Sequence, residues 1–171
     1  MIRLKILHSV VVAVLLTLAV PGSGFAQPAE PGDSKAIGGT LTQLNAAIDK
    51  LRQEPRAERY LPDVAVYAKA AEWILRHQEY YKPDYVKHTH AALKTGLTRA
   101  AQMASGKAEW NNSPGRKILG YQSAVDESIQ PFALALPEAY GKEPERRWPL
   151  HVVLHGRGAT LNEVAFIQIH D

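Results

Sequence analysis

The residues best suited to chemistry form a short loop after an apolar run. In the stretch "LHVVLHGRG", that run leads into His155, Gly156, Arg157 and Gly158. If the run is a strand buried in a sheet, the next backbone amides lie at the carboxyl edge of the sheet, where α/β proteins bind ligands. Glycine at two of these positions lets the chain turn sharply. Such a loop can hold a negatively charged oxygen through backbone N–H groups, but it supplies no nucleophile.

A helix is expected to begin directly after this loop. Thr160 and Glu163 have the spacing of a capping box, in which each side chain accepts a hydrogen bond from a backbone N–H of the first turn. The unpaired N–H groups and the positive end of the helix dipole would then lie within one turn of the loop. A plain glycine turn between a strand and a helix has the same pattern, and Arg157 is interpreted equally well as a solvated loop cation or as a contact for an acidic substrate.

The other polar and aromatic residues give weaker signals. His88 and His90 are two positions apart, so on a helix they point to different sides and are not expected to share a metal. The scattered acids on predicted helices are expected to be mostly solvated: Glu58, Asp63, Glu72 and Glu79. A group of aromatic residues can stack on sugars, but packing between helices is the favoured interpretation: Trp73, Tyr80, Tyr81 and Tyr85. The absence of cysteine excludes disulfides and thiolate metal sites.

The first 26 residues are predicted to be a cleaved export signal. Arg3 and Lys5 precede an apolar run over residues 10–20, and the small residues Gly24 and Ala26 suit a peptidase that cuts after Ala26. The run is short for a membrane core of about 30 Å, which favours cleavage over a permanent anchor. We therefore expect a secreted or periplasmic protein with no stable membrane anchor after cleavage.

Residues 27–39, "QPAEPGDSKAIGG", are predicted to be a flexible tether because they offer almost nothing to bury. The chain carries a net charge of +3, and two of its basic residues belong to the predicted signal. Elsewhere Lys and Arg alternate with Glu and Asp, as on a solvated surface, and no clustered basic face is apparent. A nucleic-acid partner is not expected.

Residues 40–106 are predicted to form a helical leader domain of about three antiparallel helices. The first helix is expected to start at Thr40, where Gln43 would complete a capping box. The second should start at Pro62 and the third near Lys82, ending at Gly106. Apolar residues recur at helical spacing, and those expected to face inward are Leu41, Leu44, Ile48 and Leu51, then Val64, Tyr67, Ala68, Ala71, Ile74 and Leu75, then Val86, Thr89, Leu93, Leu97, Ala100 and Met103.

Residues 107–171 have a different character. The strand-like runs "KILGYQSAV" and "QPFALALP", joined by "DES", predict a hairpin. The run "LHVVLHG" is apolar on both faces, as expected of a strand buried inside a helix-covered sheet. The predicted fold class is therefore α+β, an α-helical leader followed by a β-hairpin and the first buried strand of a larger sheet. Only "EVAFIQIHD" follows to cover that strand, so this region is expected to be poorly packed or to depend on self-association.

The stretch "GYQSAVDESIQPFALALPEAY", followed by "WPLHVVLHGRGATLNEVAFI", resembles the start of a secreted α/β-hydrolase of the prolyl oligopeptidase and esterase-like family. In that family two antiparallel strands lead into a third strand that ends in His-Gly. The resemblance covers roughly the last third of the chain. The segment "DVAVYAKAAEWILRHQEYY" is similar, more weakly, to the helical leader that precedes such domains in secreted members.

The resemblance implies that His155, Gly156, Arg157 and Gly158 form an oxyanion-hole loop. The Arg157 N–H would be one donor, and a donor of this kind contributes about 3 to 4 kcal/mol to transition-state stabilisation. His155 would shape the loop and would not be the catalytic base. The family places its Ser on a G-x-S-x-G elbow after a later strand, followed by the acid and the His. None of the triad residues is found, since the sequence contains no G-x-S-x-G.

The resemblance thus implies the N-terminal part of a serine hydrolase, truncated before the nucleophile elbow and inactive alone. Its substrate would be a small-molecule ester or a peptide, and no metal or organic cofactor is needed. A second hypothesis is a small exported helical interaction module without catalysis, whose hairpin and strand add to the sheet edge of a partner.

Overall fold

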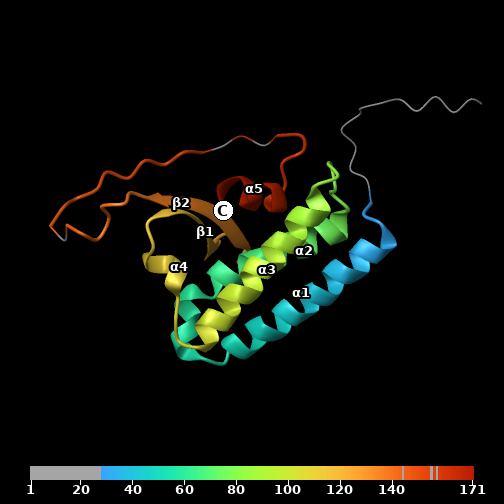
Figure 1. Cartoon of the computed structure of the whole chain (residues 1–171), viewed down its shortest axis with the longest axis horizontal. Coiled ribbons are helices and arrows are strands. Elements are labelled where there is room, and N and C mark those ends of the chain that lie inside the picture. The colour runs from blue at the N-terminus through green and yellow to red at the C-terminus, as the bar shows by residue number, and fades with distance from the viewer. Residues whose placement is uncertain (1–27, 144, 155, 157) are drawn as a thin grey trace, which may run out of the picture.

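A computed structural model describes residues 28–143, 145–154, 156 and 158–171, so the predicted signal lies outside the described residues. Long helices form one helical layer, a bundle in which each helix contacts the other two: α1 (Pro31–Leu51), α2 (Pro62–His77) and α3 (Tyr85–Ala104) (Figure 1). A 3-10 helix, η1 (Pro55–Tyr60), joins α1 to α2, and the short α4 (Glu109–Asn112) follows α3. The strands β1 (Gly115–Gln122) and β2 (Ile129–Leu136) and the helix α5 (Glu163–His170) pack on the α2 and α3 side of this layer. The fold class is α+β.

The first helix begins earlier than predicted. It starts at Pro31, so residues 31–39 of the predicted tether form its first turns, and the expected start at Thr40 is wrong. A proline at the first helical position and an acid in the first turn, Asp33, favour this start. Ile37 is fully buried, which gives these turns an apolar anchor. Thr40 caps nothing; its Oγ1 donates to the Ala36 carbonyl inside the helix at 3.1 Å.

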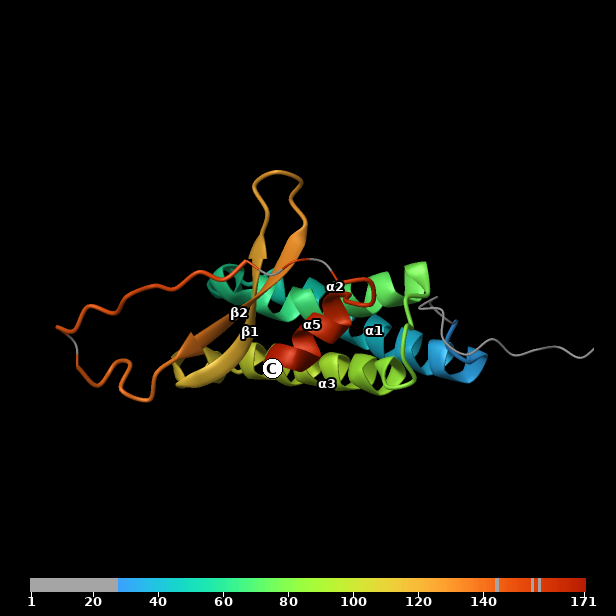
Figure 2. The ribbon, with the colours of Figure 1, turned by 90° about the horizontal axis from the view of Figure 1, so that it is seen from above.

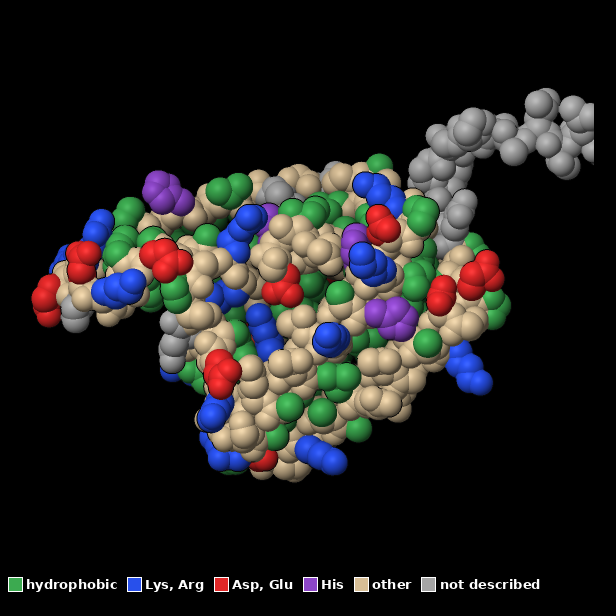
Figure 3. All heavy atoms as spheres, in the orientation of Figure 1, with side chains coloured by type: hydrophobic (Ala, Val, Ile, Leu, Met, Phe, Trp, Pro, Cys, Tyr) green, Lys and Arg blue, Asp and Glu red, His purple; other side chains and the backbone are tan. Residues whose placement is uncertain are grey.

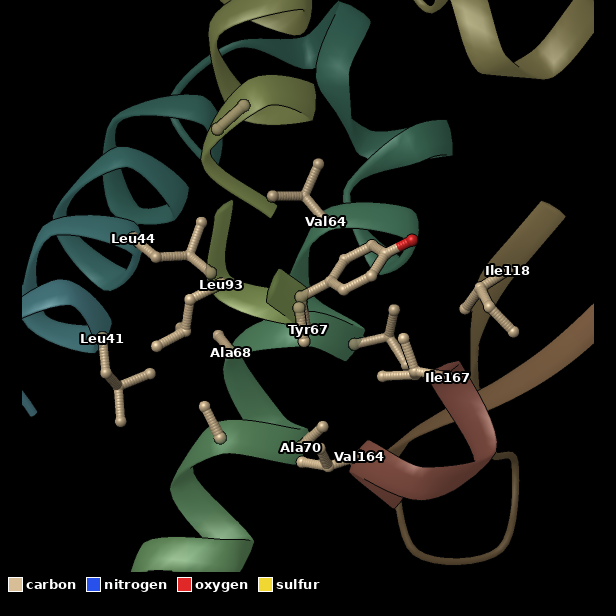
Figure 4. Packing of buried hydrophobic residues seen from close by; sticks show 14 of the residues in the cluster. Leu41, Leu44, Val64, Tyr67, Ala68, Ala70, Leu93, Ile118, Val164 and Ile167 are labelled. Atoms are coloured by element: carbon tan, nitrogen blue, oxygen red, sulfur yellow. The ribbon is translucent and has the colours of Figure 1, made fainter. Parts of the chain in front are cut away.

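The predictions for α2 and α3 are confirmed. Helix α2 begins at Pro62 and ends where Gln78 adopts a left-handed conformation with φ 52°. Helix α3 stops just before Gly106, which has φ 77°. The predicted inward positions are buried or, at Leu75, Val86 and Leu97, partly buried. Figure 4 shows leucines of α1 and α3 facing one another beside Tyr67 of α2.

The predicted hairpin is also confirmed. β1 and β2 are antiparallel, with Gly115 opposite Leu136 and Gln122 opposite Ile129. In the turn, Asp126 Oδ1 accepts hydrogen bonds from the Ser128 N–H and Oγ at 3.2 and 2.7 Å. These bonds lower the pKa of Asp126. Figure 2 shows the hairpin crossing the helical layer, with its turn projecting beyond the helices.

The predicted buried strand is not formed within the described residues. Leu150, Val152, Val153 and Leu154 have no strand assignment and are 82, 71, 86 and 91% exposed. The sheet has two strands, so nothing pairs with this run or covers its two faces. The residues belong to an extended arm, described over 137–143 and 145–154, that runs out from β2 and back (Figure 1), and apolar side chains are visible along it in Figure 3. A buried strand needs neighbours, and the described chain provides none.

The expectation that the region after Gly106 is poorly packed or depends on self-association is wrong for two elements. Ile118 of β1 is fully buried, and Val164 and Ile167 of α5 are 1 and 2% exposed. One apolar core therefore unites residues of α1, α2 and α3 with residues of β1 and α5. The apolar run of the arm lies outside that core, as does Val125 in the hairpin turn, which is 96% exposed. Among the described helices, none is both long and apolar enough to cross a membrane.

Candidate functional site

The described part of the predicted oxyanion-hole loop is exposed. His155 and Arg157 lie outside the described residues, whereas Gly156 and Gly158 are described and solvent-accessible. The loop connects the exposed arm to α5. On the α5 side of the loop the chain returns to the core.

Helix α5 is capped by a residue that the sequence analysis missed. Asn162 is the N-cap, and its Oδ1 accepts a hydrogen bond from the Ala165 N–H at 3.0 Å. The capping box predicted at Thr160 and Glu163 is wrong because the helix starts at Glu163. The preference of Asn for N-caps, with an acid directly after it, is the sequence signal that could have found this start.

Two hydrogen bonds join the residues just before α5 to the helical leader. Tyr85 Oη donates to the Thr160 carbonyl, and Asn162 Nδ2 donates to the Glu79 carbonyl at 3.0 Å. Glu79 lies in the connection between α2 and α3, and Tyr85 is the first residue of α3. The segment between the loop and α5 is thus hydrogen-bonded to this connection and to the start of α3.

An ion pair holds the first residue of α5. Lys69 Nζ lies 2.5 Å from Glu163 Oε1, and the two side chains are 13 and 23% exposed. Burial raises the pKa of Glu163; Lys69 opposes this shift and the nearby Glu79 adds to it. Lys69 also lies 5.1 Å from the centre of the Trp73 ring. The ion pair is therefore sheltered, unlike a surface pair.

The apolar face of α5 rests on the helical layer. Its buried residues are consecutive: Val164, Ala165, Phe166 and Ile167. Figure 4 places Val164 beside Ala70 and Ile167 near Tyr67 of α2. Burying an aliphatic side chain contributes about 1.5 to 3 kcal/mol, so this face supplies most of the attachment and the polar contacts set its position.

A second polar cluster lies under the hairpin. Asp63, predicted to be solvated, is 7% exposed. Its Oδ1 accepts from the Gly120 N–H at 2.9 Å and its Oδ2 from Trp110 Nε1 at 3.1 Å. Burial raises the pKa of Asp63, while these hydrogen bonds and the neighbouring Arg99 oppose the shift.

Arg99 completes this cluster. Its Nη1 donates to the Ile118 carbonyl at 2.7 Å and to the Asp63 carbonyl at 3.2 Å. Its guanidinium lies 5.0 Å from the ring centres of both Tyr67 and Trp110. The side chains of Asp63 and Arg99 are thus engaged with β1 and with ring faces, so the cluster fixes the hairpin on the helices and offers no free nucleophile.

No known protein family, curated protein or solved structure matches this chain. Its function therefore has to be inferred from its own residues and contacts.

The remaining predicted candidates come together at no second site. Within the described residues, no group of three or more His, Asp and Glu side chains is placed to hold a metal. The packing interpretation of the aromatic group is confirmed for Tyr80 and Tyr85, which are 5 and 4% exposed, and is wrong for Trp73, which is 44% exposed. The prediction of solvation holds for Glu58, whereas Glu72 and Glu79 are half-buried.

Proposed function

We propose that the chain is the N-terminal portion of an exported serine hydrolase, an esterase or peptidase, that contributes the oxyanion-hole loop and is inactive alone. The order of elements supports this proposal: an antiparallel hairpin, Pro137 directly after it, an apolar run and then His-Gly. The observation that carries it is the exposure of Leu150 and Val152 to Leu154 immediately before that loop.

The exposed run suits a strand that other parts of a sheet would cover. Each of these aliphatic side chains stands to gain about 1.5 to 3 kcal/mol on burial. Both faces are apolar, so the run fits a strand with neighbours on either side better than an edge strand. A strand completed in this way would end at Gly156 and present the loop at the edge of the sheet.

The chemistry would be acyl transfer to water. A Ser attacks an ester or amide carbonyl, a His moves the proton, and backbone N–H groups stabilise the tetrahedral oxyanion. In this chain the loop residues His155, Gly156, Arg157 and Gly158 would provide that stabilisation, with the Arg157 N–H as one donor. The Ser, the acid and the His would come from sequence other than these residues. The reaction needs no metal or organic cofactor.

Ester hydrolysis tests this proposal. Residues 27–171 are compared with the same chain extended through the coding sequence that follows Asp171, using an activated short-chain ester. We expect turnover by the extended chain alone. A following sequence without a G-x-S-x-G elbow and a late His, or an extended chain that leaves the ester intact, would contradict the proposal.

The open edge of β2 favours a second candidate, an exported interaction module without catalysis. The Gly120 N–H and the Ile118 carbonyl bind Asp63 and Arg99, so the outer edge of β1 is occupied by the helices. By the antiparallel alternation, the Ala133 N–H and the carbonyls of Pro131 and Ala133 point to the outer edge of β2, where Pro131 has no N–H to donate. A strand of a partner could add there. Tight binding of a partner by an extended chain that hydrolyses no ester would favour this module.

A further inference from the structure

We propose that the helical leader positions the segment Gly158–Glu163, and that Tyr85 and Asn162 are the positioning residues. This inference deepens the proposed function and rests on it for its catalytic consequence, because the segment continues directly from the oxyanion-hole loop. The leader would then fix the position of the loop instead of only separating it from the signal. The contacts themselves are properties of this chain and are measured without any catalysis.

The first tie, the hydrogen bond from Tyr85 to the Thr160 carbonyl, has a donor that is held in place. Tyr85 is 4% exposed, and its ring packs edge-to-face against Tyr81 with centres 6.3 Å apart. A ring held in this way cannot swing, so its Oη defines where the Thr160 carbonyl lies. Tyr85 starts α3, so the tie connects the segment to a long helix of the core.

The second tie, the hydrogen bond from Asn162 to the Glu79 carbonyl, comes from a side chain that also caps α5. Asn162 Oδ1 caps α5 at the Ala165 N–H, while Nδ2 donates to the Glu79 carbonyl at 3.0 Å. The connection that carries Glu79 is itself ordered, since the Glu79 N–H donates to the Ile74 carbonyl at 3.3 Å. The start of α5 is therefore coupled to the end of α2 through a single amide group.

The ion pair adds a third attachment at the next residue. Glu163 forms an ion pair with Lys69 of α2. The segment therefore contacts the leader through the Thr160 carbonyl and through the side chains of Asn162 and Glu163. Inside the segment, the Leu161 N–H donates to the Gly158 carbonyl at 3.3 Å. Contacts this close to the oxyanion-hole loop restrict the position of the residues that follow it. An oxyanion site requires donors that are already positioned, so these contacts would favour the function of the loop.

The two ties can be removed without removing the cap or the core. Tyr85→Phe deletes only the hydroxyl. Asn162→Ser keeps an N-cap oxygen but loses the donor to Glu79. Tyr121→Phe and Asn45→Ser are matched controls, because both positions are exposed and neither residue takes part in the two hydrogen bonds.

Native-state hydrogen exchange of residues 27–171 tests the proposal. We expect the Leu161 amide to exchange about fivefold faster in Tyr85→Phe and in Asn162→Ser, the factor expected for one lost hydrogen bond, while amides inside α2 and α3 keep their rates. The controls should change neither set. Unchanged exchange at Leu161 would overturn the proposal. Equal acceleration of all amides would also overturn it, because the ties would then serve only global stability.

A second readout separates this proposal from the proposed function. In the extended chain, Tyr85→Phe should lower kcat for the activated ester while KM stays the same, since positioning of the loop acts on the transition state. An extended chain that hydrolyses no ester, combined with the expected local exchange, would reject the hydrolase and keep the tie. A variant whose KM changes while kcat and exchange at Leu161 do not would reject the tie.

Discussion

The core helices and the arm over residues 137–143 and 145–154 contain similar apolar side chains in opposite environments. Tyr67, Leu93 and Leu44 are fully buried, whereas Val153 and Leu154 are 86 and 91% exposed. The two regions differ in whether a neighbouring segment of the chain covers them. The helices bury one another and receive β1 and α5, while the arm has no neighbouring strand in the described chain. An apolar pattern shows that a segment requires cover, but it does not identify the segment that covers it.

The largest expected effect would break the contact between β1 and α2. A Cβ at Gly120 would lie 2.0 Å from the Pro62 carbonyl oxygen, and backbone atoms cannot yield as a flexible side chain can. Gly120→Ala should therefore displace β1 and lower the free energy of unfolding by about 3 kcal/mol, measured by urea titration. Gly38→Ala, in a helix with open space, is the control and should be neutral or stabilising. Equal stability of the two variants would contradict this packing.

A somewhat smaller loss should follow removal of the buried cation. Arg99→Met keeps an apolar stem between Tyr67 and Trp110 but leaves the Ile118 and Asp63 carbonyls without their donor. A buried acceptor left unsatisfied costs about 1 to 3 kcal/mol. Calorimetry should show a lower Tm for this variant, with exposed Arg52→Met as the control. A Tm equal to that of the unchanged chain would remove the role assigned to Arg99.

The arm should respond in the opposite way. Val153→Asp should leave the free energy of unfolding within about 0.5 kcal/mol, because the side chain is already in solvent. The exposed run should make the unchanged chain self-associate as its concentration rises, and the substitution should reduce this association in sedimentation velocity. A large loss of stability would show that the arm is packed in solution.

The smallest effect concerns pH. Because burial raises the pKa of Glu163 above its usual value of 4.5, the folded chain binds that proton more tightly than the unfolded chain. The resulting stability is fully present below pH 4.5 and is lost as pH rises through the raised pKa. Glu163→Gln should remove this step from a series of urea midpoints. A decline of the same size in both proteins would assign the step to another group, such as Asp63.

Local patterns predicted the parts of the fold that are local. Helical spacing and Pro62 were sufficient for α2, and strand runs around a turn were sufficient for the hairpin. The early start of α1 differs from the prediction because Pro and Gly are typical of a tether, although Pro31 suits a first helical turn and Ile37 packs into the core. The predicted strand at Leu150 does not form because a strand requires neighbouring strands, which the periodicity of one segment does not supply.

The candidate site also has parts that local sequence patterns predict and parts that they do not. The oxyanion-hole loop stays a prediction from His-Gly and the glycines, whereas cap preferences favour Asn162 as the N-cap that the structure shows. The bond from Tyr85 to Thr160 and that from Gly120 to Asp63 join residues far apart in the sequence. Their positions depend on how the helices pack, so no local pattern predicts them.

Labelling with a fluorophosphonate probe tests the central claim most directly, because the probe reacts with an activated Ser and reports its location by mass. We predict no adduct on residues 27–171, and a single adduct on the extended chain at a Ser of a G-x-S-x-G elbow. An adduct within residues 27–171, or none on the extended chain, would contradict the assignment of this chain as the oxyanion-loop portion of a serine hydrolase.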